Sequence, residues 1–181
     1  QNLITNGNFE TGNTSSWGGF NNQVLTDDMT NSSVGNVNNG EGSLLQVFTV
    51  IPGATYDVTF DYKWVSGSGN YNMTARVKED ASGGSDLGTL VLNSTPNVWQ
   101  NAATFSFTVP SGISTVRLVF YKVNGNRPLR LDNVSVVDQS SSPPSFVDSN
   151  TPTNAQPMGV SGDWTLDFSD EFNDSSLNLS K

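Results

Sequence analysis

Short segments in which apolar and polar residues alternate constrain this chain more than any other feature. In residues 55–65 the apolar side chains fall on every second position, at Tyr56, Val58, Phe60, Tyr62 and Trp64. The positions between them, from Asp57 to Lys63, are polar. Because successive side chains of a β-strand point to opposite faces, this pattern predicts antiparallel strands with one buried face and one solvated face.

Turn-forming residues separate these segments and leave no stretch with the periodicity of a long helix. Turns are marked by Pro52-Gly53, Pro110 to Gly112 and Asn124-Gly125. Extended segments are expected near residues 2–4, 23–26, 44–50, 55–65, 71–78, 89–92, 99–109, 115–122 and 129–138. So many short strands predict an all-β fold, a two-sheet antiparallel β-jelly roll (β-sandwich). Between Trp17 and Leu44 the Asn-rich sequence gives only a faint strand signal.

The charge of the chain and its missing residue types exclude several functions. Its 181 residues carry a formal net charge of −9. Nucleic acids and anionic membranes are bound by clustered Lys and Arg, so neither is an expected partner, and heavily sulfated polysaccharides are disfavoured for the same reason. Cysteine and histidine are absent, which excludes disulfides, thiolate metal sites and histidine-based catalysis. Neutral glycans remain possible partners.

The composition changes after residue 138. Residues 139–162 are rich in Ser, Pro, Thr and Asn without periodicity, which is typical of a semi-extended linker that buries no core. Residues 1–138 are long enough to bury one core and form the predicted module. No signal peptide or membrane span is visible, and Gln1 fits a mature terminus left by processing. We therefore expect a secreted or cell-surface protein.

Three motifs in residues 2–138 resemble the family 4-like carbohydrate-binding modules, a group that includes families 4, 9 and 22. They are Asn2-Leu-Ile-Thr-Asn-Gly-Asn-Phe-Glu10 with a following Trp17, Leu44-Leu45-Gln46 with a following Pro52-Gly53 turn, and Leu131-Asp132-Asn133-Val134-Ser135-Val136. The resemblance implies a β-jelly roll that binds a carbohydrate chain without cleaving it.

Residues 164–173 read Trp-Thr-Leu-Asp-Phe-Ser-Asp-Glu-Phe-Asn and resemble the opening strand of a glycoside hydrolase family 16 domain. The resemblance implies that residues 163–181 are the truncated start of a covalently linked catalytic domain, in a bacterial extracellular protein. That family carries its catalytic carboxylates in a Glu-x-Asp-x-x-Glu strand, and the chain contains no such string. Asp170 and Glu171 are adjacent, so on a strand they would point to opposite faces. The chain itself is therefore expected to be noncatalytic.

Glu10 and Asp132 lie at the two ends of the predicted module. The first and last strands of a jelly roll commonly lie side by side, and the two carboxylates would then repel each other unless a cation joined them. The resemblance implies a structural Ca²⁺, which takes six to eight oxygen ligands, held by Glu10 and Asp132 with Asn8 or a nearby carbonyl. The alternative is that both carboxylates cap turns by accepting hydrogen bonds from backbone N–H groups.

Sugars are recognised by aromatic rings that stack on their C–H faces and by polar side chains that bond their hydroxyls. Trp17 precedes a Gly-Gly pair, Trp64 precedes a Ser/Gly loop, and Tyr121 lies on the mostly polar face of its segment. Trp99 shares the parity of Phe105 if its strand is unbroken, which favours a core position. The alternative for each ring is burial in the core, and the alternative for Arg76 is a solvated surface charge that contacts no sugar. The candidate carbohydrate-binding residues are Trp64, Tyr121, Trp17, Tyr71, Arg76 and Trp99.

The expected function is binding of a neutral β-glucan, of the laminarin-type β-1,3-linked kind, by a monomeric module that tethers its hydrolase to the polysaccharide. Two alternatives remain. One is a module for an anionic algal galactan, bound by a basic patch of Arg117, Lys122, Arg127 and Arg130. The other is a protein-binding spacer at the cell surface.

Overall fold

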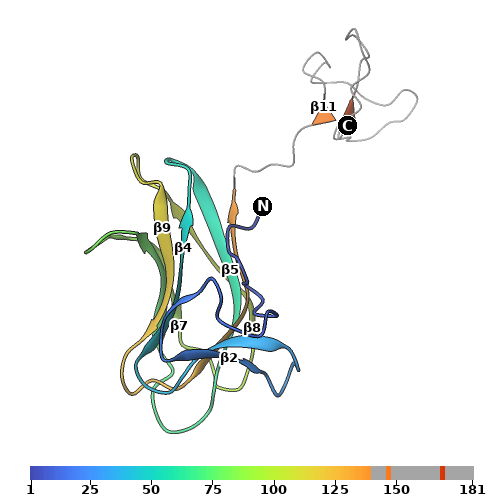
Figure 1. The fold of residues 1–181 in the computed structure, drawn as a ribbon, viewed down its shortest axis with the longest axis vertical. Helices are drawn as coiled ribbons and strands as arrows, with labels where there is room; N and C mark the ends of the chain where they lie inside the picture. Colours follow the sequence, from blue (N-terminus) through green and yellow to red (C-terminus); the bar gives the residue numbers. More distant parts are fainter. Residues whose placement is uncertain (140–145, 148–167, 170–181) are drawn as a thin grey trace. The chain divides into compact units, whose positions relative to one another are not determined.

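The computed structural model describes residues 1–139, 146–147 and 168–169, and residues 1–139 form a sandwich of two antiparallel sheets (Figure 1). The first sheet has the order β1 (Gly18–Phe20), β4 (Gly42–Thr49), β9 (Thr115–Lys122), β6 (Met73–Glu79) and β7 (Asp86–Leu92). The second sheet has the order β2 (Asn22–Thr26), β3 (Ser33–Val37), β10 (Leu129–Asp138), β5 (Thr55–Trp64) and β8 (Gln100–Thr108). The described residues contain no helix. The predicted all-β jelly-roll sandwich is confirmed.

The chain divides into two compact units, Gln1–Ser140 and Ser141–Lys181. In the second unit, β11 (Phe146–Val147) pairs in parallel with β12 (Phe168–Ser169). Apart from Gln139 and these two strands, the predicted linker at 139–162 and the predicted hydrolase start at 163–181 lie outside the described residues. Those two boundaries stay predictions.

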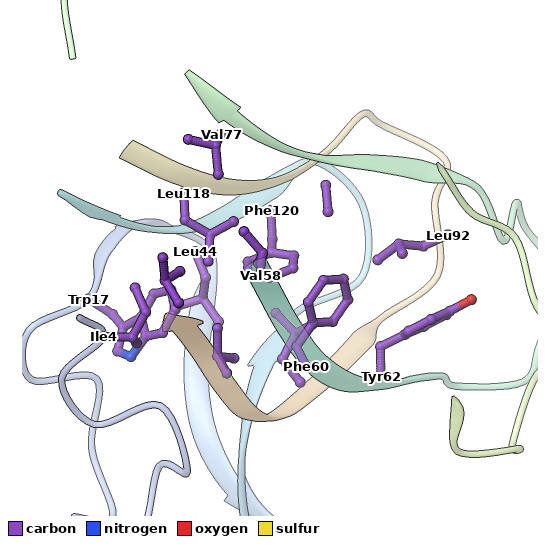
Figure 2. Close-up of a cluster of buried hydrophobic side chains, with 14 of the residues drawn as sticks. Ile4, Trp17, Leu44, Val58, Phe60, Tyr62, Val77, Leu92, Leu118 and Phe120 are labelled. Atoms are coloured by element: carbon purple, nitrogen blue, oxygen red, sulfur yellow. The ribbon is translucent and has the colours of Figure 1, made fainter. Parts of the chain in front are cut away.

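The core lies between the two sheets and is filled by the alternating apolar side chains of the long central strands. In β5, Val58, Phe60 and Trp64 have no exposed surface, and in β9 the same holds for Leu118 and Phe120. All five belong to one hydrophobic cluster, and Figure 2 shows Val58 and Phe60 of β5 close to Leu118 and Phe120 of β9. The residues between them, which are polar in β5 and are Arg117, Val119 and Tyr121 in β9, lie on the outer faces, as the alternation predicts.

Within the sandwich, two strands, β1 and β3, were not expected from the sequence. In β3 every residue from Val34 to Val37 is buried, so no alternation marks the strand. Gly35 is required there, because a Cβ atom would lie 2.5 Å from Cζ of Phe9. β1 is a short glycine-rich edge strand, in which Gly19 has φ +109° and packs directly on the carbonyl of Ser43.

The N-terminal segment runs beside β10, although residues 2–4 form a single bridge rather than the expected strand. Asn2 bridges Val137, and Leu3 N donates to Val136 O at 2.9 Å. Further along, Val134 N donates to Gly7 O at 2.9 Å. These bonds bring the Asn8–Glu10 segment next to the bulge after Asp132.

Candidate functional site

The outer face of the first sheet carries a row of residues, one from each strand, that is rich in exposed apolar groups. The backbone register pairs Phe20 with Ser43, Ser43 with Tyr121, Tyr121 with Thr74 and Thr74 with Val91. Phe20, Tyr121 and Val91 are 49%, 40% and 53% exposed. We call these five residues the Phe20–Val91 row. Since neighbouring strands lie about 4.8 Å apart, the row spans about 19 Å, with about 10 Å between the backbones that carry the two rings.

Tyr121 points outward because its neighbours Phe120 and Lys122 point into the sandwich, where both are fully buried. Its hydroxyl donates a hydrogen bond to a carboxylate oxygen of Glu41. That bond, more than any other interaction, raises the pKa of Tyr121 above its ordinary value. The ring is thus both exposed and held at its hydroxyl end.

Arg76 lies on the same outer face, next to the Phe20–Val91 row. In the register it pairs with Val119 on one side and Thr89 on the other. Its guanidinium nitrogen Nη1 donates to Asp86 Oδ2 at 2.8 Å, and the side chain is 36% exposed. Of the predicted sugar-contacting residues, the structure therefore brings Tyr121 and Arg76 together on one face. Phe20, which the sequence did not single out, completes that face.

Two predicted sugar-binding rings are buried, so the expectation that they face solvent is wrong. Trp17 is only 7% exposed; its loop folds inward, the ring stacks on Phe9 with centroids 5.3 Å apart, and Nε1 donates to Asn6 O. Trp64 has no exposed surface, because it continues the inward parity of Phe60 at the end of β5. Neither ring offers a face to a sugar.

Tyr71 is half-buried and closes the loop that follows Trp64. Its ring meets the edge of Trp64 with centroids 6.2 Å apart. Its hydroxyl donates to Gly67 O and accepts from Gly67 N. These bonds give Tyr71 a structural task in the loop, and the structure does not place it in the Phe20–Val91 row.

Trp99 lies on the outer face of the second sheet, half-buried, and not in the core that its parity favoured. A bulge at Ala102, which has φ 53°, interrupts the register of β8 against β5 between Phe60 and Tyr62. The bulge breaks the alternation that would have linked Trp99 to Phe105. The Trp99 ring instead lies 5.2 Å from Nζ of Lys63, and Nε1 donates to Asp27 at 3.4 Å.

A buried charge network fixes the loop between β2 and β3 to this second face. Asp27 has no exposed surface, and its carboxylate accepts from Lys63 Nζ at 2.7 Å and from Arg130 Nη1. Its other donors are the backbone N–H groups of Met29 and Thr30, the Thr30 hydroxyl and Nε1 of Trp99. Burial alone would raise the pKa of Asp27, but the bonds from Lys63 and Arg130 outweigh it and hold the pKa well below its usual range. No pattern in the sequence indicates this network.

The three predicted metal ligands, Asn8, Glu10 and Asp132, line one hollow of about 350 Å³ together with Asp61 and Trp99. Burial raises the pKa of Asp132 to about 6 against the hydrogen bond from Asn133 N, and the charges of Asp61 and Glu10 add to the rise. Among the described residues, no three acidic side chains are close enough together to hold a metal ion by themselves. A cation here would also need amide or backbone carbonyl oxygens.

The turn-capping contacts expected as the alternative are also present in this hollow. Glu10 Oε1 accepts from Ser33 N at 3.1 Å, and Asp132 Oδ1 accepts from Asn133 N at 2.8 Å. These hydrogen bonds use one oxygen of each carboxylate. The other oxygen of each carboxylate has no hydrogen-bond donor among the described residues, so capping and cation binding are compatible.

The expected basic patch of Arg117, Lys122, Arg127 and Arg130 does not form as one surface, so the structure gives the anionic-galactan alternative no support. Arg117, on the first sheet, pairs with Asp80 at 3.0 Å, whereas Arg130, on the second sheet, pairs with Asp27 and Asp28. Lys122 is fully buried, and burial lowers its pKa to about 8. Arg127 donates to Asn39 and to Ser66 O between loops. Lys122 and Arg127 thus bond the same turn, residues 38–40, whereas Arg117 and Arg130 lie on different sheets, so the four cations do not form one exposed patch.

Comparison with known proteins decides the family. Residues 1–126 match the family model described as carbohydrate binding domain, of the CBM 4/9 type. The chain belongs to this carbohydrate-binding family. The match contains Phe20, Tyr121, Arg76 and the hollow residues Asn8 and Glu10, and it ends before Asp132. No curated protein sequence matches the chain.

Solved structures share the fold of this carbohydrate-binding module. A family 16 carbohydrate binding module superposes with a TM-score of 0.60 at 21% identity, over 75% of this chain and 99% of that one. A structure described under CBM4 structure and function gives 0.56 at 18% identity, over 75% and 99%. The module TmCBM61, in complex with β-1,4-galactotriose, gives 0.54 at 16% identity, over 77% and 99%. Within the described residues of the module, no helix is long and apolar enough to cross a membrane.

Proposed function

We propose that this module binds a neutral β-glucan, of the β-1,3-linked laminarin type, on the outer face of its first sheet. The observation that carries the proposal is the Phe20–Val91 row. It sets two exposed rings, Phe20 and Tyr121, on either side of Ser43, which is only 4% exposed, with the half-buried Thr74 beyond. Rings that stack on sugar C–H faces, beside polar side chains such as Thr74 and Arg76 that bond sugar hydroxyls, are what a polysaccharide chain needs.

The shape and charge of this face support a neutral polymer. The row runs from one edge strand of the sheet, β1, to the other, β7, so a chain that follows it would cross all five strands. Each nearby cation has a carboxylate partner: Arg76 and Lys78 share Asp86, and Arg117 pairs with Asp80. Arg76 remains the polar side chain on this face best placed to bond a sugar hydroxyl. Affinity should be modest, since several hydroxyls must lose water on binding.

Tethering is the proposed use of this binding, outside the cell and as a monomer. A family 16 hydrolase joined through residues 139–162 would be held near its substrate, which raises the effective concentration of chain around the catalytic domain. The module contributes no catalytic residues to this task.

Isothermal titration of the whole chain against a glycan panel tests the proposal. The panel contains laminarin, cellulose oligosaccharides, xylan and β-1,4-galactan, because solved relatives are described with xylan and with β-1,4-galactotriose. Laminarin is expected to bind, with an affinity that changes less than about twofold between low and high salt, since no ionic contact is involved. If binding heat is measured only with another neutral glycan of the panel, the proposed ligand changes from the β-1,3-linked glucan to that glycan. The absence of binding heat with all four glycans would favour the spacer function. An affinity that falls steeply with salt would contradict a neutral ligand.

We also propose that the hollow holds a structural Ca²⁺ through Glu10, Asp132 and Asn8. The donor set fits, because it offers the hard carboxylate and amide oxygens that calcium prefers, and a cation would relieve the repulsion that Asp132 experiences from Asp61 and Glu10. The ion would join the N-terminal segment to β10. Its role is stability, since the hollow lies on the sheet opposite the Phe20–Val91 row.

Chelation provides the test of the calcium proposal. A stabilisation of about 2.7 kcal/mol is expected when calcium is 100-fold above its Kd, so the melting temperature should fall when EDTA replaces CaCl₂. The double variant Glu10→Gln, Asp132→Asn should melt at one temperature in both buffers. The conservative control Asp57→Asn, on the same sheet but outside the hollow, should keep the calcium response. An unchanged melting temperature of the native chain in EDTA would remove the proposal.

A further inference from the structure

The turn between β3 and β4 lies beside both exposed rings and is bonded to the segments that carry them. The residue after Phe20 is Asn21, whose Nδ2 donates to Asn39 O at 3.1 Å and to Glu41 O at 2.7 Å. The Tyr121 hydroxyl donates to the Glu41 side chain. One turn, Asn38 to Glu41, therefore connects two ring-bearing strands that are separated by about 100 residues of sequence.

The same turn is fixed from its inner side. Lys122 follows Tyr121 in the chain and points the opposite way, into the sandwich, where its Nζ donates to Asn38 O at 2.6 Å and to Gly40 O at 2.8 Å. Gly40 N donates to Asn126 O at 2.9 Å. The end of β9 thus holds the turn from both sides, with Tyr121 outside and Lys122 inside. These bonds hold the backbone of the turn that carries Glu41.

The bond to Glu41 restricts the Tyr121 ring. Tyr121 is paired with Ser43, two residues beyond Glu41 on β4. A free tyrosine on an open face can occupy several χ1 wells, but a hydroxyl bonded to Glu41 keeps only the well that points the ring toward the turn. A ring already held in its binding orientation loses less conformational entropy when a ligand stacks on it.

We propose that Glu41 is a positioning residue for glycan binding, which acts through the Tyr121 hydroxyl to hold the ring in its stacking orientation. The Asn38–Glu41 turn, bonded also to Asn21, sets the spacing between this ring and Phe20. The inference rests on the proposed function, because it assigns a role within the same face. The competing role is direct: the exposed Glu41 carboxylate would bond a sugar hydroxyl itself.

A double-mutant cycle separates the two roles, with laminarin as the titrant, or the panel glycan that binds if laminarin does not. Tyr121→Phe and Glu41→Ala should each weaken binding about three- to tenfold, the value of one hydrogen bond. The double variant should bind no more weakly than either single variant, because both remove the same restraint. Glu41→Gln keeps an acceptor and should stay within about twofold of the native affinity. The control Asp57→Ala removes a carboxylate from the other sheet and should change nothing.

A titration without ligand checks the bond itself. The difference in tyrosinate absorbance between the native chain and Tyr121→Phe reports Tyr121 alone, and it should titrate above an ordinary tyrosine. In Glu41→Gln the midpoint should fall, because a neutral amide no longer opposes the phenolate. A midpoint that Glu41→Gln leaves in place overturns the inference.

The affinity results have equally definite readings. If adding Glu41→Ala to Tyr121→Phe weakens binding further, Glu41 contacts the sugar directly, and the positioning role is overturned. Native affinity in Glu41→Ala would also overturn the positioning role, because Glu41 would then contribute nothing to binding. If the titration shows the bond but no panel glycan binds the native chain, the proposed function fails, and the positioning role fails with it.

Discussion

Replacing Asp27 with Ala is expected to lower the free energy of unfolding by about 3–5 kcal/mol, as measured by urea denaturation followed through tryptophan fluorescence. The carboxylate has no exposed surface and lies 2.7 Å from Nζ of Lys63, which is only 2% exposed. Removing it leaves the buried Lys63 ammonium with only the exposed Asp28 carboxylate, at 3.7 Å, and it also frees the N–H groups of Met29 and Thr30. Most of the lost free energy of unfolding comes from the poorly compensated charge of the buried Lys63 ammonium.

Asp28 is the matched control, because it pairs with the same two cations but is 79% exposed. Asp28→Ala should cost less than about 1 kcal/mol, as exposed ion pairs do. Adding Lys63→Met to Asp27→Ala should restore part of the lost stability, since the uncompensated charge is then gone. Equal effects of the two aspartate variants would show that burial does not decide the energetics of this network.

Removing the rings of Phe20 and Tyr121 is expected to have the largest effect on binding. Each of Phe20→Ala and Tyr121→Ala should weaken laminarin binding about 10- to 100-fold, the loss typical of an aromatic residue that dominates an interface. The double variant should show no measurable heat. Because both rings are exposed, unfolding free energies should change by no more than about 0.5 kcal/mol.

Val98→Ala provides the control for these ring variants, since Val98 is 47% exposed and lies outside the Phe20–Val91 row. It should bind like the native chain. If the ring variants keep full affinity while the chain still binds glucan, the glycan lies elsewhere on the module, and the outer face of the first sheet is not the site.

The strands with one buried and one solvated face were predicted from the sequence almost to the residue. The structure has β9 at Thr115–Lys122 and β10 at Leu129–Asp138, the segments that the alternation indicates. β3 was missed because both of its faces are covered, so no period of two survives. The resemblance to the carbohydrate-binding modules is confirmed at the level of the family, whereas the hydrolase start and the glycan linkage stay predictions.

The candidate site was predictable only in part, because the outward rings depend on tertiary structure. The outward position of Tyr121 was predicted from its place on the polar face of its strand. The closeness of Glu10 to Asp132 was predicted from the expectation that the two ends of the module lie side by side. Trp17 is turned inward by its contact with Phe9, which local sequence does not encode. Trp99 does not face the core as Phe105 does, because a single bulge residue, Ala102, interrupts the alternation between them. Phe20 lies on an edge strand of three residues, too short to show any pattern.

The burial of lysines decides how this chain should be attached to a sensor surface. Of the lysines in residues 1–139, Lys63 and Lys122 are 2% and 0% exposed, so neither amine reacts readily. Lys78 is 33% exposed and extends from the outer side of β6, the same side as Tyr121. Coupling through Lys78 would therefore place the proposed glycan-binding face against the matrix, and a terminal tag or a glycan-coated chip would leave that face free.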